Sequence, residues 1–246
     1  MPAKAWAKVE SVVAEPFYKP DNRFLLASGT MEAVKWLAVI LMAMDHVNRL
    51  LLNWSHPFMF YAGRSAMPLF VFILAYNLAQ PQARENGAAR RVLERLLPIA
   101  VISSLPYLEL NMETLGFFPL NILFTLAIGT VLVMLLEHPT WPQLILAAVL
   151  FAATGKFVDY GWSGIGLFVS VWYFFRGPSL WRGAIVLLVL ILMGVVANGN
   201  QWALVAVPIL GLSFYLRLPV KRIKYALYYF YPVHLMVIAV LKITVF

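Results

Sequence analysis

The chain has 246 residues, of which 62% are hydrophobic and only 12% are charged, and its mean hydropathy is +0.80. A soluble domain carries about 25% charged residues, so this sequence offers too little polar surface for a water-facing globule. The composition therefore excludes soluble enzymes and indicates an integral membrane protein. Cysteine is absent, which excludes disulfides, thiolate nucleophiles and cysteine metal sites.

Residues 1–30 differ from the rest of the chain because they mix charged residues with prolines and contain no long apolar run. A signal peptide needs such a run, so we do not expect one. Trp6, Val9 and Val13 recur at helical spacing, which predicts a short cytoplasmic helix at the membrane interface; a solvated tail is the alternative. We expect one transmembrane domain over residues 31–246.

Apolar segments follow one another closely from residue 31 onward, and a spanning helix needs about 20 such residues. The turn signal Asn198-Gly199-Asn200 splits the uncharged run 183–216 into two. The predicted spans are 33–53, 58–79, 95–109, 118–136, 141–155, 162–176, 183–198, 201–217 and 224–244. The fold class is therefore all-α and polytopic, with about nine transmembrane helices, or about seven to nine because the third and fifth are short.

The basic residues are distributed unevenly over the loops. If the N-terminus is cytoplasmic, most Lys and Arg fall on the cytoplasmic side, in the N-terminal segment and around residues 84–95, 176–182 and 217–224. Cytoplasmic loops carry such an excess, so we predict a cytoplasmic N-terminus and a periplasmic C-terminus. This orientation accounts for the net charge of +8, and we expect no nucleic-acid partner.

Four ionisable residues lie inside predicted spans, where such residues are rare and mark functional sites: Asp45, His46, Arg64 and His234. Their depths allow them to meet around one cavity in the outer half of the membrane. Each also has a structural alternative. Arg64 can extend to the interface, Asp45 can pair with Arg49, and His234 can bond a neighbouring helix.

Lys35 and His46 form a Lys-x10-His pattern in the first span. Eleven helical residues make almost three full turns, so both side chains lie on one face, about 16.5 Å apart along the axis. A coenzyme with a phosphate head and a long arm fits that wall, and coenzyme A has this shape. Lys at a helix entry also follows from the positive-inside rule, so the pattern alone is weak.

Several segments resemble the TraX family of F-pilin acetylases in order and spacing, over roughly residues 31–246. The segments that carry the resemblance are Val34–Ala38, Leu41–His46, the Gly-Arg segment Ala62–Phe70, the basic Arg91–Leu96, Asn121–Phe124 and the aromatic Tyr229–Leu235. Met67 is a departure, since many members have Phe there. Lys-x10-His also resembles the broader membrane acyltransferases that modify surface glycans.

The resemblance implies acetyl transfer from acetyl-CoA to the N-terminal amine of a conjugative pilin, in the inner membrane of a bacterium. Our hypothesis makes His46 the general base or a transient acetyl carrier, and Arg64 the group that stabilises the oxyanion or positions the acceptor carbonyl. Asp45 orients or charges the site through Arg64. His234 is a second proton-handling or acceptor-binding group.

In the same hypothesis, Lys35, Arg91 and Arg95 bind the coenzyme phosphates from the cytoplasmic side. Arg91 and Arg95 are four residues apart and present one basic face. An orientation signal is the alternative interpretation of both arginines.

Other functions remain open on the sequence. The same chemistry can acetylate a hydroxyl of an envelope glycan, and intramembrane Asp, His and Arg also suit a proton-coupled transporter. A pilin-binding scaffold without catalysis needs no buried histidine. Direct transfer and an acetyl-histidine intermediate are not distinguished, and either His46 or His234 can be the base. We expect no metal, because His56 and His138 are not spaced from carboxylates as metal ligands are.

Overall fold

The computed structural model describes residues 24–110, 119–223 and 225–245, and the named elements in this part are all helical. This confirms the all-α prediction. The interfacial helix expected at Trp6–Val13 lies outside the described residues. The helices, in chain order, are α2 (Ser28–Leu50), α3 (Pro57–Gly63), α4 (Ala66–Ala79), α5 (Pro81–Glu85), α6 (Ala88–Leu110), α7 (Ile122–Leu136), α8 (Trp141–Thr154), η2 (Gly155–Phe157), α9 (Gly161–Arg176), α10 (Leu180–Met193), η3 (Gly194–Asn198), η4 (Trp202–Val205), α11 (Ala206–Ser213) and α12 (Ala226–Val245).

Three stretches of described helix are long and apolar enough to cross a membrane: Pro57–Ala79, Leu180–Asn198 and Ala226–Thr244. Further apolar helices are shorter, and they are Ile122–Leu136, Trp141–Phe157 and Trp202–Ser213. These helices support a membrane protein. The total of about nine spans and the orientation stay predictions.

The third predicted span, 95–109, is longer than expected, because α6 has 23 residues. The additional turns carry Arg90 and Arg91, which a search for apolar runs passes over. Arginine is nevertheless a good helix former, so the helix continues through the charged turns. The basic end of α6 therefore extends beyond its apolar part.

The second predicted span, 58–79, is interrupted at Arg64 and Ser65, between α3 and α4. Pro68 explains the break, because proline has no N–H to donate to the carbonyl four residues earlier and its ring crowds that carbonyl, which belongs to Arg64. The Ser65 hydroxyl instead donates to the Ala62 carbonyl at 2.7 Å. The interruption positions Arg64 beside the site described below.

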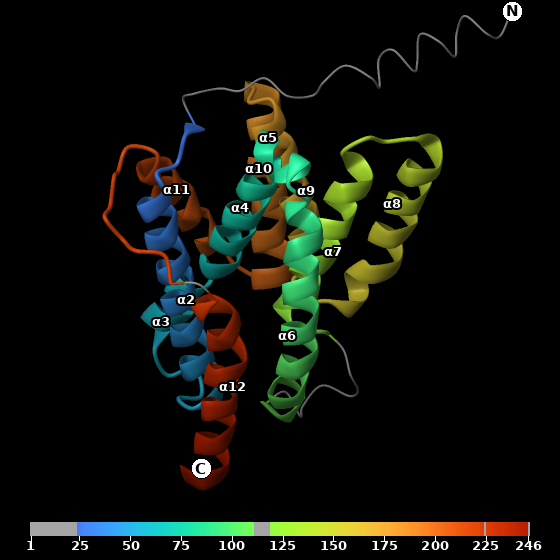
Figure 1. Cartoon of the computed structure of the whole chain (residues 1–246). Helices are drawn as coiled ribbons and strands as arrows, with labels where there is room; N and C mark the ends of the chain where they lie inside the picture. The colour runs from blue at the N-terminus through green and yellow to red at the C-terminus, as the bar shows by residue number, and fades with distance from the viewer. Residues whose placement is uncertain (1–23, 111–118, 224, 246) are drawn as a thin grey trace, which may run out of the picture.

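Helix α4 forms the centre of the core, and it is apolar and buried on most sides. It packs against α2 and α9, while α2 also contacts α12 and α7 also contacts α8. Figure 1 shows α2 and α12 side by side on one side of the molecule and α7 and α8 on the other. The Tyr76 hydroxyl ties the chain before α2 to α4, because it accepts from Leu26 N–H and donates to the Phe24 carbonyl.

Two local predictions have clear structural explanations. Asn121, within a family-like motif, caps α7 by accepting from the Leu123 N–H, and its amide donates to the Ala100 carbonyl of α6. The turn expected at residues 198–200 is confirmed, since Gly199 adopts φ +65° directly after η3. Glycine adopts this left-handed conformation without steric cost.

Candidate active site

A pair of histidines from opposite ends of the chain forms the centre of the site. His46 on α2 and His234 on α12 are joined by a hydrogen bond of 2.8 Å between His46 Nδ1 and His234 Nε2. The two rings are nearly parallel, with centroids 5.1 Å apart. His234 is 9% exposed, and its Nδ1 lies 3.0 Å from the Phe230 carbonyl. The contact between α2 and α12 therefore brings two residues together that are far apart in sequence.

This chain of hydrogen bonds fixes the tautomers of the neutral rings. A carbonyl oxygen only accepts, so His234 Nδ1 carries a proton and donates it to Phe230, which leaves His234 Nε2 as an acceptor. His46 Nδ1 must then be the donor in the contact between the rings. The lone pair of His46 is consequently on Nε2, the nitrogen that a general base or nucleophile uses.

Asp45 and Arg64 form a buried ion pair, with side chains 14% and 13% exposed. Arg64 also lies over the Phe60 ring, 4.7 Å from its centroid. Its Nε is buried and has no hydrogen-bond partner among the described residues, so one N–H of the guanidinium has no acceptor there. Neither structural alternative is observed here, since Arg49 lies over Trp54 and Arg64 turns inward to Asp45.

Gly63 allows this ion pair to form at the end of α3. A Cβ atom at this position would lie 2.5 Å from Asp45 Cβ, which is closer than real contacts allow. Because the backbone of α3 approaches α2 directly, Asp45 is held against Arg64. Packing against Asp45 therefore restricts position 63 to glycine.

We expect Gly63→Ala to lower the rate of any reaction that depends on the Asp45–Arg64 pair, because the added methyl group displaces Asp45. The substitution changes no charge. The reduction should be about tenfold or more in kcat, as for other small displacements of reacting groups. Gly211→Ala is the matched control, since nothing lies within 4 Å of a Cβ there. Equal activity of the two variants would contradict this role for Gly63.

A small cavity of about 30 Å³ adjoins Asp45 and His46. Two further residues line it and were not predicted from the sequence: Asp159 and Tyr160, in the connection between α8 and α9. Both fall between predicted spans, so a search for charges within spans does not find them. One signal was available, because Asp159 is the last acidic residue of the chain and precedes a long stretch without Asp or Glu.

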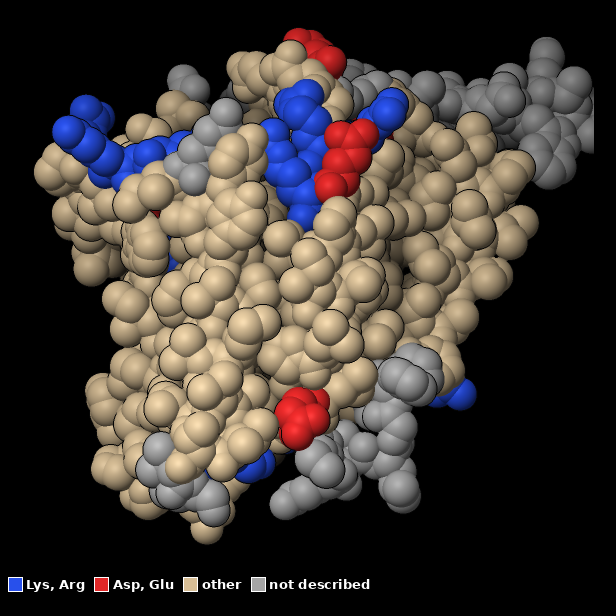
Figure 2. Space-filling model, turned by 60° about the horizontal axis from the view of Figure 1, so that its bottom comes forward, with Lys and Arg blue, Asp and Glu red and all other residues tan. Residues whose placement is uncertain are grey.

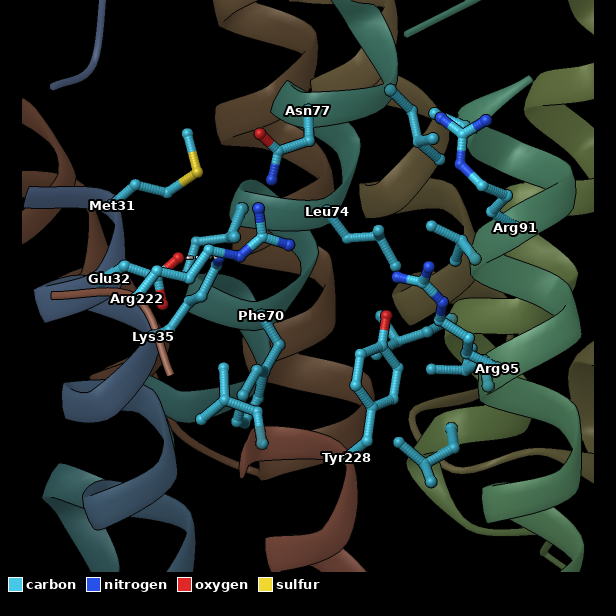
Figure 3. Close-up of a pocket in the computed structure, with 18 of the residues that line it drawn as sticks. Met31, Glu32, Lys35, Phe70, Leu74, Asn77, Arg91, Arg95, Arg222 and Tyr228 are labelled. Carbon is cyan, nitrogen blue, oxygen red and sulfur yellow. Dashed lines mark hydrogen bonds and ion pairs between the residues drawn. The ribbon is translucent and has the colours of Figure 1, made fainter. Parts of the chain in front are cut away.

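A larger pocket of about 580 Å³ lies where α2, α4, α6, α7 and α12 converge. The three residues predicted to bind coenzyme phosphates all line it: Lys35 from α2, and Arg91 and Arg95 from α6. Figure 3 shows Lys35 on one side of the pocket and Arg91 and Arg95 on the other. Its volume is within the usual range for small-molecule sites, about 300–1,000 Å³.

Several further polar residues line this pocket and were not among the predicted site residues. Arg222, in the segment before α12, adds another cation, and Tyr228 of α12 interacts with Arg95 through a side-chain hydrogen bond. Glu32 pairs with Lys35 at 2.6 Å and offsets its charge. The arginines therefore supply most of the uncompensated positive charge of the pocket. Arg222 lies in a predicted loop, between the spans 201–217 and 224–244, where its charge was interpreted only as an orientation signal.

The two cavities share a wall, because Phe70 of α4 and Tyr231 of α12 line both of them. The basic pocket thus adjoins the histidine pair. In Figure 2, Lys and Arg gather along one edge of the face in view, and a broad band without charged side chains separates them from a few charges at the opposite edge.

Within the described residues, no group of three or more His, Asp and Glu side chains is arranged to hold a metal ion. The groups described above suit acyl transfer. They comprise a base with a defined lone pair, a guanidinium N–H for an oxyanion, and a basic pocket for phosphates.

Comparison with known proteins identifies the family of the chain. The family model described as TraX protein matches residues 30–242. The chain belongs to the TraX family. It is 27% identical over 158 residues to Protein TraX of Escherichia coli strain K12, which covers 63% of this chain and 60% of that protein. A second Escherichia coli Protein TraX is 28% identical over 147 residues, covering 59% and 56%.

The chain thus matches about three fifths of the length of these TraX relatives. No solved structure matches the chain. The family match covers most of α2 and α12 and all of the helices between them. The predicted site residues, from Lys35 to His234, lie within this range.

Proposed function

We propose that this protein transfers an acetyl group from acetyl-CoA to the N-terminal amine of a conjugative pilin, in the bacterial inner membrane. The observation that carries the proposal is the wall shared by the basic pocket and the histidine cavity. A coenzyme held by its phosphates at Arg91, Arg95 and Arg222 can extend its thioester arm toward His46. Lys35 and His46, on one face of α2, define the length of this path, about 16.5 Å.

The proposed orientation places the basic pocket on the cytoplasmic side, where acetyl-CoA is available. The excess of Lys and Arg at this end is consistent with the positive-inside rule. The lipid bilayer surrounds the apolar band of the molecule. No metal takes part in the proposed reaction.

The amine must lose a proton before it attacks, because an α-amino group has a pKa near 8 and is mostly protonated at pH 7. In our mechanism His46 Nε2 accepts that proton, and His234 holds the ring in the required tautomer. The neutral amine then attacks the thioester carbonyl. The N–H of Arg64 Nε stabilises the oxyanion, while Asp45 fixes the guanidinium.

When the tetrahedral intermediate collapses, the carbon–sulfur bond breaks and the thiolate takes the proton from His46, which gives free coenzyme A. The amide nitrogen releases its second proton to solvent. Alternatively, His46 Nε2 first attacks the thioester and carries the acetyl group to the amine. Ping-pong kinetics with exchange of label between acetyl-CoA and coenzyme A would distinguish this second route.

The proposed reaction is tested with the full-length protein in liposomes, labelled acetyl-CoA and a peptide that carries the pilin N-terminus. We expect label in the peptide with a free amine and none in the same peptide with a blocked N-terminus. Label transferred only to isolated envelope glycans would instead support O-acetylation. Uptake of a solute into the liposomes without acetyl-CoA would support transport.

We expect Arg95→Gln to raise the KM for acetyl-CoA about tenfold and to leave kcat nearly unchanged. Arg95 lines the pocket, and a charge-assisted hydrogen bond contributes about 1.5–3 kcal/mol. Arg90→Gln is the matched control on the same helix, because Arg90 is 81% exposed and pairs with Glu94 outside the pocket. Steady-state kinetics that show the same KM for both variants would contradict phosphate binding at Arg95.

A further inference from the structure

Asp159 is held in place by backbone contacts with the segment that leads into α7. Its N–H donates to the Leu120 carbonyl at 2.8 Å, and its carbonyl accepts from the Thr125 hydroxyl at 2.6 Å. The next residue, Tyr160, adopts φ +60°, a left-handed conformation that is unfavourable for a bulky side chain. Strained residues of this kind persist where the surrounding contacts enforce them, and they concentrate at functional sites.

The carboxylate of Asp159 differs from the other acidic groups around the two cavities. Glu32 has Lys35 and Asp45 has Arg64 as ion-pair partners, whereas no described Lys or Arg forms an ion pair with Asp159. Its Oδ1 accepts only the N–H of Tyr160, at 3.1 Å. Against the effect of burial, Arg49 and Arg64 lower the pKa of this carboxyl group through their positive charges, but neither forms an ion pair with it. A partly buried carboxylate without an ion-pair partner is unfavourable, and a cationic ligand would compensate it.

The connection that carries Asp159 lies between α8 and α9, outside both helices. Burial raises the pKa of this carboxyl group to about 6, and the hydrogen bond from the Tyr160 N–H acts in the opposite direction. A cation bound beside the group lowers this pKa and favours the carboxylate. His46 and His234 are both neutral in our mechanism, so neither forms a permanent ion pair with Asp159.

The cavity beside Asp159 is large enough for one small polar group. Its volume of about 30 Å³ accommodates roughly one water molecule, and an ammonium group is of similar size. His46 lines the same cavity, so a group bound at the carboxylate is next to the base. An alkylammonium ion donates up to three hydrogen bonds, which a carboxylate accepts.

We infer that Asp159 binds the protonated amine of the acceptor and makes the enzyme specific for amines over hydroxyls. This inference rests on the proposed function and names the substrate class of the same site. Asp159 accepts N–H hydrogen bonds from the ammonium group, and His46 Nε2 then removes one proton from it. A sugar hydroxyl is neutral and gains no ion pair at this carboxylate, so it binds more weakly.

The test measures binding of a pilin N-terminal peptide to the full-length protein in liposomes, first without acetyl-CoA. Asp159→Asn removes the charge but keeps an oxygen that accepts from the Tyr160 N–H, so we expect the fold to persist. We expect the Kd and the KM for the peptide to rise at least tenfold, and the KM for acetyl-CoA to stay constant. Asp159→Glu should recover much of the binding.

Two controls separate recognition from folding and from net charge. Glu109→Gln removes one negative charge from an exposed position near the end of α6 and should leave peptide binding unchanged. A peptide whose terminal amine is replaced by a hydroxyl should bind the wild-type protein and Asp159→Asn equally weakly. A preference for the amine peptide that is lost in Asp159→Asn supports the inference.

Unchanged peptide binding in a folded Asp159→Asn protein would overturn the inference, and wild-type acetyl transfer would then leave the proposed function intact. The opposite failure is also recognisable. If the wild-type protein binds the amine peptide through Asp159 but transfers no acetyl group, the amine site stands and the acetyltransferase proposal fails.

Discussion

Replacing His46 with alanine is expected to lower kcat for acetyl transfer by about 10²–10⁴-fold, the usual contribution of a general base. The reason is that Nε2 of His46 is the nitrogen whose lone pair is left free by the hydrogen bonds through His234 to Phe230. The KM for acetyl-CoA should change little, because the phosphates bind in the adjoining pocket. Initial rates with labelled acetyl-CoA and the pilin peptide measure both constants.

His138→Ala is the control for this substitution, because His138 is exposed after α7 and outside both cavities. It should retain full activity. Full activity of His46→Ala together with inactivity of His234→Ala would instead make His234 the base. The sequence left this choice open, and the direction of the hydrogen bonds favours His46.

The second large effect is expected from separating Asp45 and Arg64. Removing one partner of a buried ion pair leaves an uncompensated charge, which costs about 3–5 kcal/mol. Both side chains are mostly buried, so Asp45→Asn or Arg64→Gln should each lower stability by about 3 kcal/mol. Denaturant titration of the purified protein in detergent measures this loss of stability.

The double variant Asp45→Asn/Arg64→Gln should recover most of the stability, since neither charge remains, but acetyl transfer should stay absent because the oxyanion donor is lost. The exposed pair Arg90–Glu94 provides the comparison, and Arg90→Gln should cost less than about 1 kcal/mol. A double variant that is stable and fully active would show that Arg64 has only a structural role.

Much of the helical architecture was predictable, because apolar segments of about 20 residues and the turn at Gly199 determine where helices begin and end. The extension of α6 through its arginines was missed, since an apolar-run search cannot detect charged helical turns. The break at Arg64 was also missed, although Pro68 four residues later supplies the physical cause. Both features affect the site, because they position Arg91 and Arg64.

Asp45, His46, Arg64 and His234 were selected by the cost of burying charge. Asp45 and His46 line the smaller cavity, while Arg64 and His234 contact them as ion-pair and hydrogen-bond partners. Lys35, Arg91 and Arg95, predicted from spacing and resemblance, line the larger pocket. The partners of the first four were not predictable from one sequence. Neither the contact of His46 with His234 nor that of Asp45 with Arg64 follows from helical spacing, because each depends on how different helices pack. Asp159 lies between predicted spans, where charged residues are common and do not by themselves indicate a site.

The most direct test of the account is the mass of the pilin N-terminus after co-expression with this protein. We predict a gain of about 42 Da, the change expected when one acetyl group replaces a hydrogen, and its loss with His46→Ala. An unmodified pilin in cells that contain the folded wild-type protein would contradict the account.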